Sequence, residues 1–139
     1  TKHYLSLCGE HLSVDNMTNA IEMVSTELNI SIPEFTVAGV PSGSLFGHKW
    51  FVATDNKVDS NLLIQKIDEK LKILNDDYCV ERTSALRDVT IEVLPVEVFY
   101  KWMDSQGKIG GQNKFPRVMK NKTYEKWQAF LNEVKVSQS

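Results

Sequence analysis

The residues best suited to chemistry lie in one stretch, Gly107-Lys108-Ile109-Gly110-Gly111-Gln112-Asn113-Lys114-Phe115-Pro116-Arg117. Gly110 and Gly111 permit backbone conformations that other residues avoid, and Pro116 limits the rotation of Phe115 just after Lys114. A pliable loop with a fixed, lysine-bearing tip suits a cation that is delivered to a site built elsewhere. One ammonium about 4 Å from a phosphate oxygen is worth roughly 4 kcal/mol at an effective dielectric near 20. Arg117 can hold a carboxylate or a phosphate in a bidentate fork.

This stretch is not a Walker A loop. Its glycine-to-lysine spacing is wrong, Phe115 replaces the required Ser or Thr, and a helix rather than a strand is expected before it. The pattern is equally typical of a mobile surface turn with ordinary lysines. The residues alone therefore leave both interpretations open.

Basic residues gather around the same stretch. Between Lys101 and Lys126 the chain carries seven basic and two acidic residues, a local charge of +5 in a chain of net charge −2. Such a segment can attract a phosphate, although a solvated surface loop is the simpler explanation. One alternative function is a free-standing α+β module that binds RNA through residues 101–126, with Phe115, Tyr124 and Trp127 stacking on bases. Against it, Tyr124 and Trp127 lie on a stripe needed for packing, and no RNA-binding signature is present.

Length and composition exclude several other classes of protein. The chain has 139 residues, of which 42% are hydrophobic and 24% charged, which indicates one globular domain rather than a disordered tail. No apolar run is long enough to span a bilayer. Cys8 and Cys79 are far apart, and the three histidines lack ligand spacing, so we expect no metal site. Two lone thiols without a secretory signal favour the cytoplasm, and Thr1 in place of an initiator Met suggests a piece of a longer protein.

Hydrophobic periodicity predicts the elements that position this stretch. Strands are expected at 3–7, 35–40, 50–54 and 89–94, and helices at 15–28 (capped by Asp15 or Asn16), 59–74, 75–87 and 98–103, with a last helix from Thr123. Residues 107–122 are expected to form a loop. The order is β-α-β-β-α-β, which predicts an α+β fold with a small mixed sheet, a ferredoxin-like core and extra C-terminal helices.

Three segments together resemble a known family. Gly110-Gly111-Gln112-Asn113-Lys114-Phe115-Pro116-Arg117 is similar to the closing motif of the Gretchen Hagen auxin-responsive family of acyl-acid amido synthetases and their bacterial relatives, within the adenylate-forming superfamily. Leu74-Asn75-Asp76-Asp77-Tyr78-Cys79-Val80-Glu81-Arg82 resembles that family's Leu-Asn-x-x-Tyr-x-x-x-Arg helix, and Val98-Phe99-Tyr100-Lys101-Trp102 resembles its Thr-Phe-Tyr-x-Trp segment. The likeness extends over nearly the whole chain.

The resemblance implies that residues 1–139 are the C-terminal lid domain of a larger ATP-dependent ligase whose N-terminal ATP- and acyl-binding domain is absent. Such enzymes activate a carboxylic acid as an acyl-adenylate, which an amino acid then converts to an amide. It implies that Lys114 is the catalytic residue, directed at the nucleotide phosphates, and that Gly110, Gly111, Gln112, Asn113 and Arg117 form a nucleotide-binding loop. The expected partners are the enzyme's own N-terminal domain and the two substrates, with neither nucleic acid nor membrane. ATP and Mg²⁺ would bind outside this fragment, which we expect to be inactive alone.

Two details refine this interpretation. Plant members of the family usually carry Tyr where this chain has Asn113, so the chain resembles the bacterial members more closely, and plant hormone substrates do not follow. Tyr78 and Arg82 lie one helical turn apart and can share a face with Asn75. We expect them to serve in packing and helix capping and assign them no catalytic role.

Overall fold

The computed structural model describes residues 4–5, 12–42, 45–84, 86–106 and 115–138. These residues form short and long strands together with five helices. In chain order the elements are β1 (Tyr4–Leu5), β2 (Leu12–Ser13), α1 (Val14–Leu28), β3 (Glu34–Ser42), β4 (Leu45–Ala53), α2 (Ser60–Leu74), α3 (Asp76–Ser84), β5 (Leu86–Leu94), α4 (Val96–Ser105), β6 (Val118–Met119) and α5 (Asn121–Gln138).

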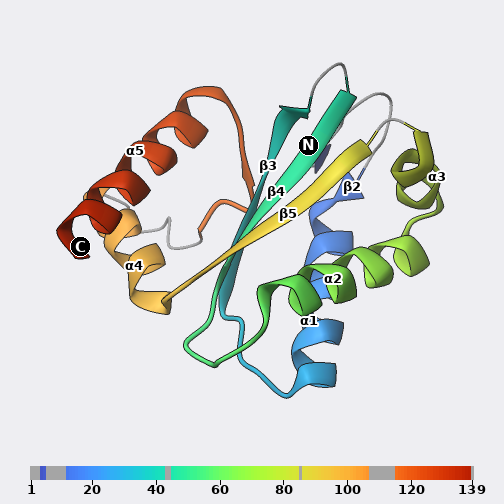
Figure 1. The fold of residues 1–139 in the computed structure, drawn as a ribbon, viewed down its shortest axis with the longest axis horizontal. Helices are drawn as coiled ribbons and strands as arrows, with labels where there is room; N and C mark the ends of the chain where they lie inside the picture. The colour runs from blue at the N-terminus through green and yellow to red at the C-terminus, as the bar shows by residue number, and fades with distance from the viewer. Residues whose placement is uncertain (1–3, 6–11, 43–44, 85, 107–114, 139) are drawn as a thin grey trace.

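Among the described residues, the central sheet has the strand order β5-β4-β3-β6 (Figure 1). β3 and β4 pair antiparallel, with Val37 opposite Trp50. β5 pairs with β4 in parallel, and β6 pairs with β3 in parallel, so the sheet is mixed. A parallel pair needs a crossover connection, and α2 and α3 supply it between β4 and β5.

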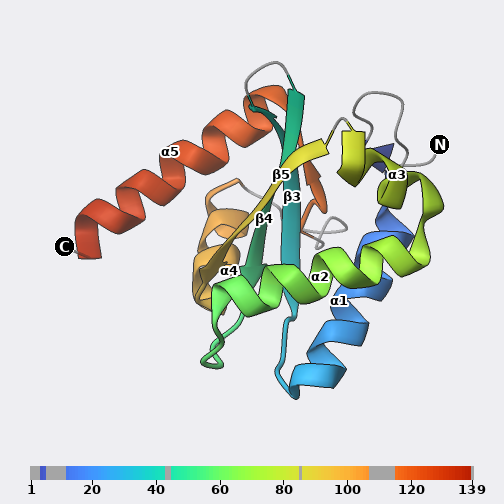
Figure 2. The ribbon, with the colours of Figure 1, turned by 45° about the vertical axis from the view of Figure 1, so that its right-hand side comes forward.

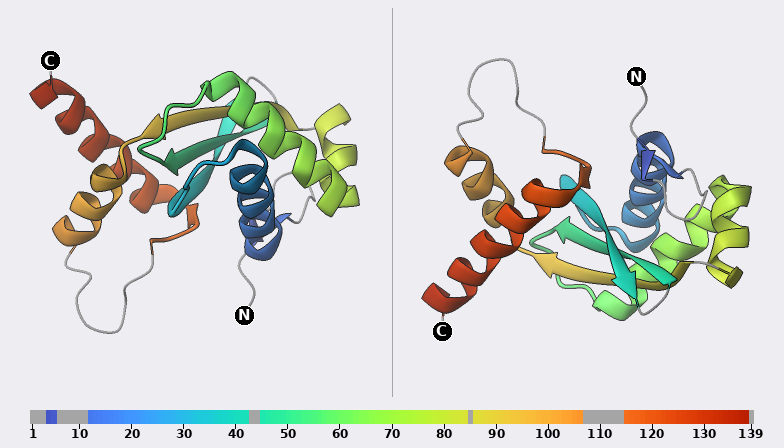
Figure 3. Two further views of the ribbon diagram at one scale, coloured as in Figure 1. Left: turned by 90° about the horizontal axis from the view of Figure 1, so that it is seen from below. Right: turned by 90° about the horizontal axis from the view of Figure 1, so that it is seen from above.

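The sheet separates two layers of helices. Helices α1, α2 and α3 cover one face, and α4 and α5 cover the other (Figures 2 and 3). Successive side chains of a strand point to opposite faces, so β4 serves both layers. Trp50 and Val52 pack in the core with α1 and α2, whereas Phe51 and Ala53 pack with α4 and α5. A strand buried on both faces explains why residues 50–53 are apolar without interruption.

The apolar stripes predicted on the helices form these cores. The buried residues that α1 and α2 contribute are Met17, Ala20, Ile21, Val24, Leu63, Ile67 and Leu71. Those that α4 and α5 contribute are Val98, Phe99, Trp102, Met103, Trp127 and Leu131. Burial of one stripe per helix is the pattern expected when helices pack on a sheet.

The start of α1 differs from the predicted cap. The N-cap is Ser13, whose Oγ accepts the Asn16 N–H at 3.1 Å while Asn16 Oδ1 accepts the Ser13 N–H at 3.4 Å. The predicted caps, Asp15 and Asn16, both lie inside the first turn. Asn16 thus satisfies a backbone donor from the third helical position, as Glu or Gln does in the usual capping box.

The predicted fold class is confirmed: the chain is α+β, with a small mixed sheet flanked by helices and with additional C-terminal helices. Two strands differ from the prediction, one in the sheet to which it belongs and one in lying where a loop is predicted. Tyr4–Leu5, in the predicted first strand, pairs with β2 in a separate two-stranded sheet. β6 lies in the region predicted as a loop and joins the central sheet beside β3. In the part of the chain that the structure describes, β6 therefore forms one edge of the central sheet, and Tyr4–Leu5 is not part of that sheet.

Candidate functional site

The lysine-bearing stretch is described only at its C-terminal end. Gly110, Gly111, Gln112, Asn113 and Lys114 lie outside the described residues, so their predicted roles stay predictions. Phe115, Pro116 and Arg117 are described, as is α4 on the other side of the gap. The contacts of these flanking residues show where the stretch joins the rest of the fold.

Phe115 anchors the stretch in the core between the sheet and helices α4 and α5. Its side chain is 2% exposed. Its ring centroid lies 4.7 Å from that of Phe99, 5.2 Å from that of Trp102 and 5.3 Å from that of Trp127. Aromatic pairs at these separations and tilted angles are favourable beyond the area they bury. The residue that follows Lys114 is therefore held firmly in place.

Arg117 anchors the stretch on the other face of the sheet. Its Nη1 donates to Glu34 Oε1 at 2.8 Å and to the Phe35 carbonyl oxygen at 3.0 Å. The guanidinium carbon lies 4.4 Å from the centroid of the Phe35 ring, which belongs to the core under α1 and α2. The Arg117 carbonyl oxygen also accepts the Val37 N–H at 2.9 Å. The backbone and the side chain of Arg117 are thus both bonded to β3.

These two anchors lie on opposite sides of the sheet edge. Phe115 belongs to the core with α4 and α5, and Arg117 covers a residue of the core with α1 and α2. The chain crosses the edge between them and continues directly into β6. Chemically, the site offers a partly exposed guanidinium beside the point where the lysine-bearing stretch enters the fold. Binding of a nucleotide by Arg117 stays a prediction.

The basic segment contains both paired and solvent-exposed cations. Lys101 pairs with Glu97 at 3.5 Å, one turn earlier on α4, and both side chains are well exposed. Such surface pairs contribute little to stability. Lys120, Lys122 and Lys126 are also exposed. Of the three aromatic residues that the RNA-binding alternative requires to stack on bases, Phe115 and Trp127 are buried and Tyr124 is partly buried.

A second polar cluster links α2 and α3. The Tyr78 hydroxyl donates to Asp68 Oδ1 at 2.5 Å, and Arg82 Nε donates to the same oxygen at 2.9 Å. Tyr78 is fully buried, which confirms its packing role. The capping role belongs to Asn75, whose Oδ1 accepts the Tyr78 N–H at 2.9 Å. Sequence reasoning missed Asp68, because nothing in its spacing marks it as the partner of residues 10 and 14 positions later.

His48 lies beside this cluster, with its ring centroid 6.2 Å from that of Tyr78. The pKa of His48 is lowered from 6.5 to about 4, chiefly because burial penalises the charged ring and also because Arg82 is near, while Asp68 acts in the opposite direction. The folded state therefore favours neutral His48. Its contribution to stability is complete above pH 6.5 and is lost as the pH falls toward 4.

We expect the free energy of unfolding to fall by about 2–3 kcal/mol between pH 7 and pH 4.5 through His48 alone. Urea unfolding at a series of pH values measures this, with His48→Gln as the matched variant that lacks the titrating ring. The difference between the two proteins isolates His48 from the carboxylates. An equal pH dependence in the variant would show that His48 does not carry the effect.

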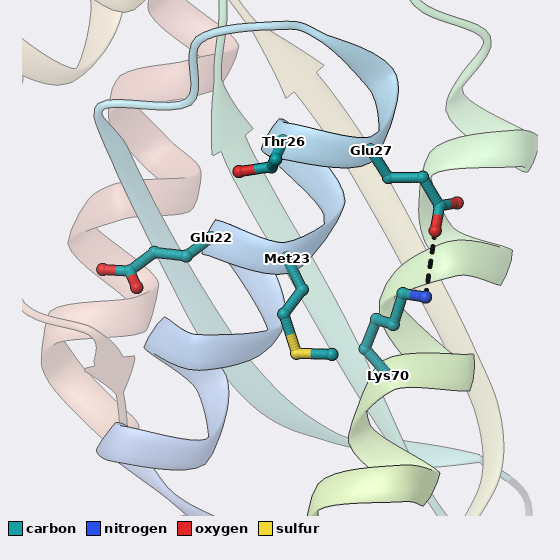
Figure 4. A pocket seen from close by; sticks show the side chains of 5 residues that line it. All are labelled: Glu22, Met23, Thr26, Glu27 and Lys70. Atoms are coloured by element: carbon teal, nitrogen blue, oxygen red, sulfur yellow. Dashed lines mark ion pairs between the residues drawn. The ribbon is translucent and has the colours of Figure 1, made fainter.

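A shallow hollow of about 440 Å³ lies between α1 and α2, lined by Glu22, Met23, Thr26, Glu27 and Lys70 (Figure 4). Glu27 bridges the two helices, with carboxylate oxygens 3.0 Å from Lys70 Nζ and 2.7 Å from Lys66 Nζ. These two bonds lower the pKa of Glu27. The hollow is therefore a groove between two packed helices, which the ion pairs of Glu27 link.

Among the described residues, no group of three or more His, Cys, Asp or Glu side chains is arranged to hold a metal ion. Within the same part of the chain, no helix combines the length and the apolar character that crossing a bilayer requires.

The fold is similar to part of two solved structures. It is similar to a "GH3.15 acyl acid amido synthetase", with a TM-score of 0.76 and 18% identity over 95% of this chain and 25% of that chain. It is also similar to an "AtGH3.15 acyl acid amido synthetase in complex with 2,4-DB", with a TM-score of 0.69 and 18% identity over 96% of this chain and 26% of that chain. The chain thus spans about a quarter of the length of these proteins. No match is found among curated proteins.

The sequence match identifies the family. Residues 15–123 match the GH3 family C-terminal domain, which is more than half of the 139 residues. The chain therefore belongs to the GH3 (Gretchen Hagen) family, and the resemblance seen in the three sequence segments is confirmed. The matched region contains the whole of the lysine-bearing stretch and its anchors.

Proposed function

We propose that this chain is the C-terminal lid domain of an ATP-dependent acyl-acid amido synthetase. The larger enzyme would convert a carboxylic acid and ATP to an acyl-adenylate and pyrophosphate. The amine of an amino acid would then displace AMP and form an amide. The match of residues 15–123 to the family's C-terminal domain is the observation that carries this proposal.

Lys114 would supply positive charge to the nucleotide phosphates. Its ammonium would offset the negative charge that builds up on the α-phosphate as the carboxylate attacks, which is a form of electrostatic transition-state stabilisation. The anchored position of Phe115 supports this role, because the residue bonded to Lys114 is fixed by three aromatic rings. A fixed end restricts where the lysine can reach and reduces the entropy lost when it engages a phosphate.

The neighbouring residues would complete the nucleotide-binding loop. Gly110 and Gly111 would let the backbone approach the nucleotide closely, with Gln112 and Asn113 offering amide groups and Arg117 a guanidinium. The N-terminal domain would bind ATP, Mg²⁺ and the acid. We place the enzyme in the cytoplasm, on the ground of the two isolated cysteines of this chain.

The whole enzyme and this chain alone test the proposal together. With ATP, Mg²⁺, a panel of carboxylic acids and amino acids, the whole enzyme should release AMP and form an amide that mass spectrometry detects. The 139-residue chain alone should form none under the same conditions, because it lacks the acyl-binding domain. Amide formation by the isolated chain, or none by the whole enzyme with any pair of substrates, would contradict the proposal.

A further inference from the structure

Among the described residues, the Arg117 guanidinium is hydrogen-bonded through one nitrogen, Nη1. Nη1 makes both of the bonds described above, to Glu34 Oε1 and to the Phe35 carbonyl oxygen. A guanidinium has five N–H donors on three nitrogen atoms. Nη2 and Nε form no hydrogen bond with another residue in the described ranges. The edge formed by these two nitrogens is a pair of parallel donors, which is the geometry that binds two oxygens of a phosphate.

Packing on an aromatic ring also restrains the guanidinium. It lies over the ring of Phe35, which is 2% exposed and stacks in turn on Trp50 at 5.8 Å between centroids. The Arg117 main chain is hydrogen-bonded to β3. Much of the rotamer entropy that an arginine loses on binding a ligand is therefore already lost in the folded domain.

Glu34 pairs with Nη1 of Arg117 and leaves Nη2 and Nε without a partner among the described residues. The Arg117 side chain is 26% exposed and that of Glu34 is 18% exposed. Both side chains are thus partly exposed, that of Arg117 somewhat more than that of Glu34. A nearby carboxylate lowers the net positive charge of the site, so charge alone does not explain its presence there. A role in fixing the orientation of Nη2 and Nε of Arg117 does explain why Glu34 lies there.

We propose that Glu34 is a positioning residue of the reaction: it holds Arg117 so that Nη2 and Nε bind two oxygens of a phosphate group of ATP. This inference rests on the proposed function and adds Glu34, a residue outside the glycine-lysine stretch. The bond between Glu34 and Arg117 fixes the cation at the sheet edge, where the stretch enters the fold. ATP binding by the whole enzyme is therefore the quantity to measure.

The test compares four forms of the whole enzyme: wild type, Glu34→Ala, Glu34→Gln and the charge-swapped double variant Glu34→Arg with Arg117→Glu. Equilibrium dialysis gives the Kd for ATP, and thermal unfolding gives Tm. We expect Glu34→Ala to raise the Kd about tenfold or more, as loss of a charge-assisted bond can. Glu34→Gln keeps an acceptor oxygen and should give an intermediate Kd. The swapped pair should recover the Tm lost by Glu34→Ala while its Kd stays high.

A purely structural ion pair gives a different result. In that case the charge-swapped double variant would recover the wild-type Kd for ATP together with the wild-type Tm, and this outcome would overturn the inference. A Kd for Glu34→Ala within about twofold of the wild-type value would overturn it as well. Acid-dependent pyrophosphate exchange in the same samples tests the proposed function separately. ATP binding that depends on Glu34, found without pyrophosphate exchange, would refute the proposed function and keep only the role of Glu34 in ATP binding. Pyrophosphate exchange together with ATP binding that does not depend on Glu34 would keep the function and refute that role. No ATP binding at all would refute both.

Discussion

Replacing Lys114 by Ala in the whole enzyme should slow acyl-adenylate formation by about two to three orders of magnitude, the usual cost of removing one charge-stabilising donor. In the proposed mechanism the effect would arise because charge grows on the α-phosphate only as the reaction proceeds, so the lysine would contribute more to the transition state than to ATP binding. Acid-dependent release of pyrophosphate measures this step apart from amide formation. The Kd for ATP should change much less than the rate.

Lys120→Ala is the matched control for this variant. Lys120 lies in the same basic segment and is exposed, so its removal lowers the segment's charge by the same amount. It should leave the rate within about twofold, as is usual for a surface substitution. Equal losses in both variants would point to general charge attraction rather than to one positioned lysine. An unchanged rate in Lys114→Ala would remove Lys114 from the mechanism.

Replacing Trp127 by Ala should destabilise the domain by about 3–5 kcal/mol, the typical cost of deleting a large buried aromatic side chain. Trp127 is fully buried at the centre of the core formed with α4 and α5. The neighbouring rings within 6.1 Å of its own, between centroids, are Phe51, Phe99, Trp102, Phe115 and Phe130. The loss would be a large part of the roughly 5–15 kcal/mol that stabilises a typical domain.

Urea unfolding of the 139-residue chain, followed by circular dichroism, measures this effect. Tyr100→Ala is the control, because Tyr100 is an aromatic residue of α4 that is 48% exposed. It should change the unfolding free energy by no more than about 0.5 kcal/mol. A loss below about 1 kcal/mol for Trp127→Ala would show that the aromatic core has been overestimated.

Much of the fold follows from periodicity in the sequence. The stripes on α1 and α2 and the double-sided burial of residues 50–53 are patterns that a single stretch of sequence carries by itself. β6 could not be found in this way. It has two residues, and no alternation can be read from two positions. It becomes a strand because Arg117 and the residues after it dock on β3, which is a tertiary event.

The same limit applies to the candidate site. The residue type of Arg117 and its place after Lys114 mark it as a candidate in the sequence. Nothing marks its partner Glu34, because 83 positions separate the two residues and a carboxylate at the start of a strand is ordinary in sequence. Ser13 was missed as the cap of α1 for a local reason, since Asn16 is an unusual partner in a capping box.

Acid-dependent ATP–pyrophosphate exchange, measured on the whole enzyme and on the same enzyme lacking residues 1–139, tests most directly whether this domain takes part in the chemistry. We predict rapid exchange with the domain and a fall of at least about a hundredfold without it, because the phosphate-directed cation would be lost. Exchange at the full rate without the domain would contradict the account.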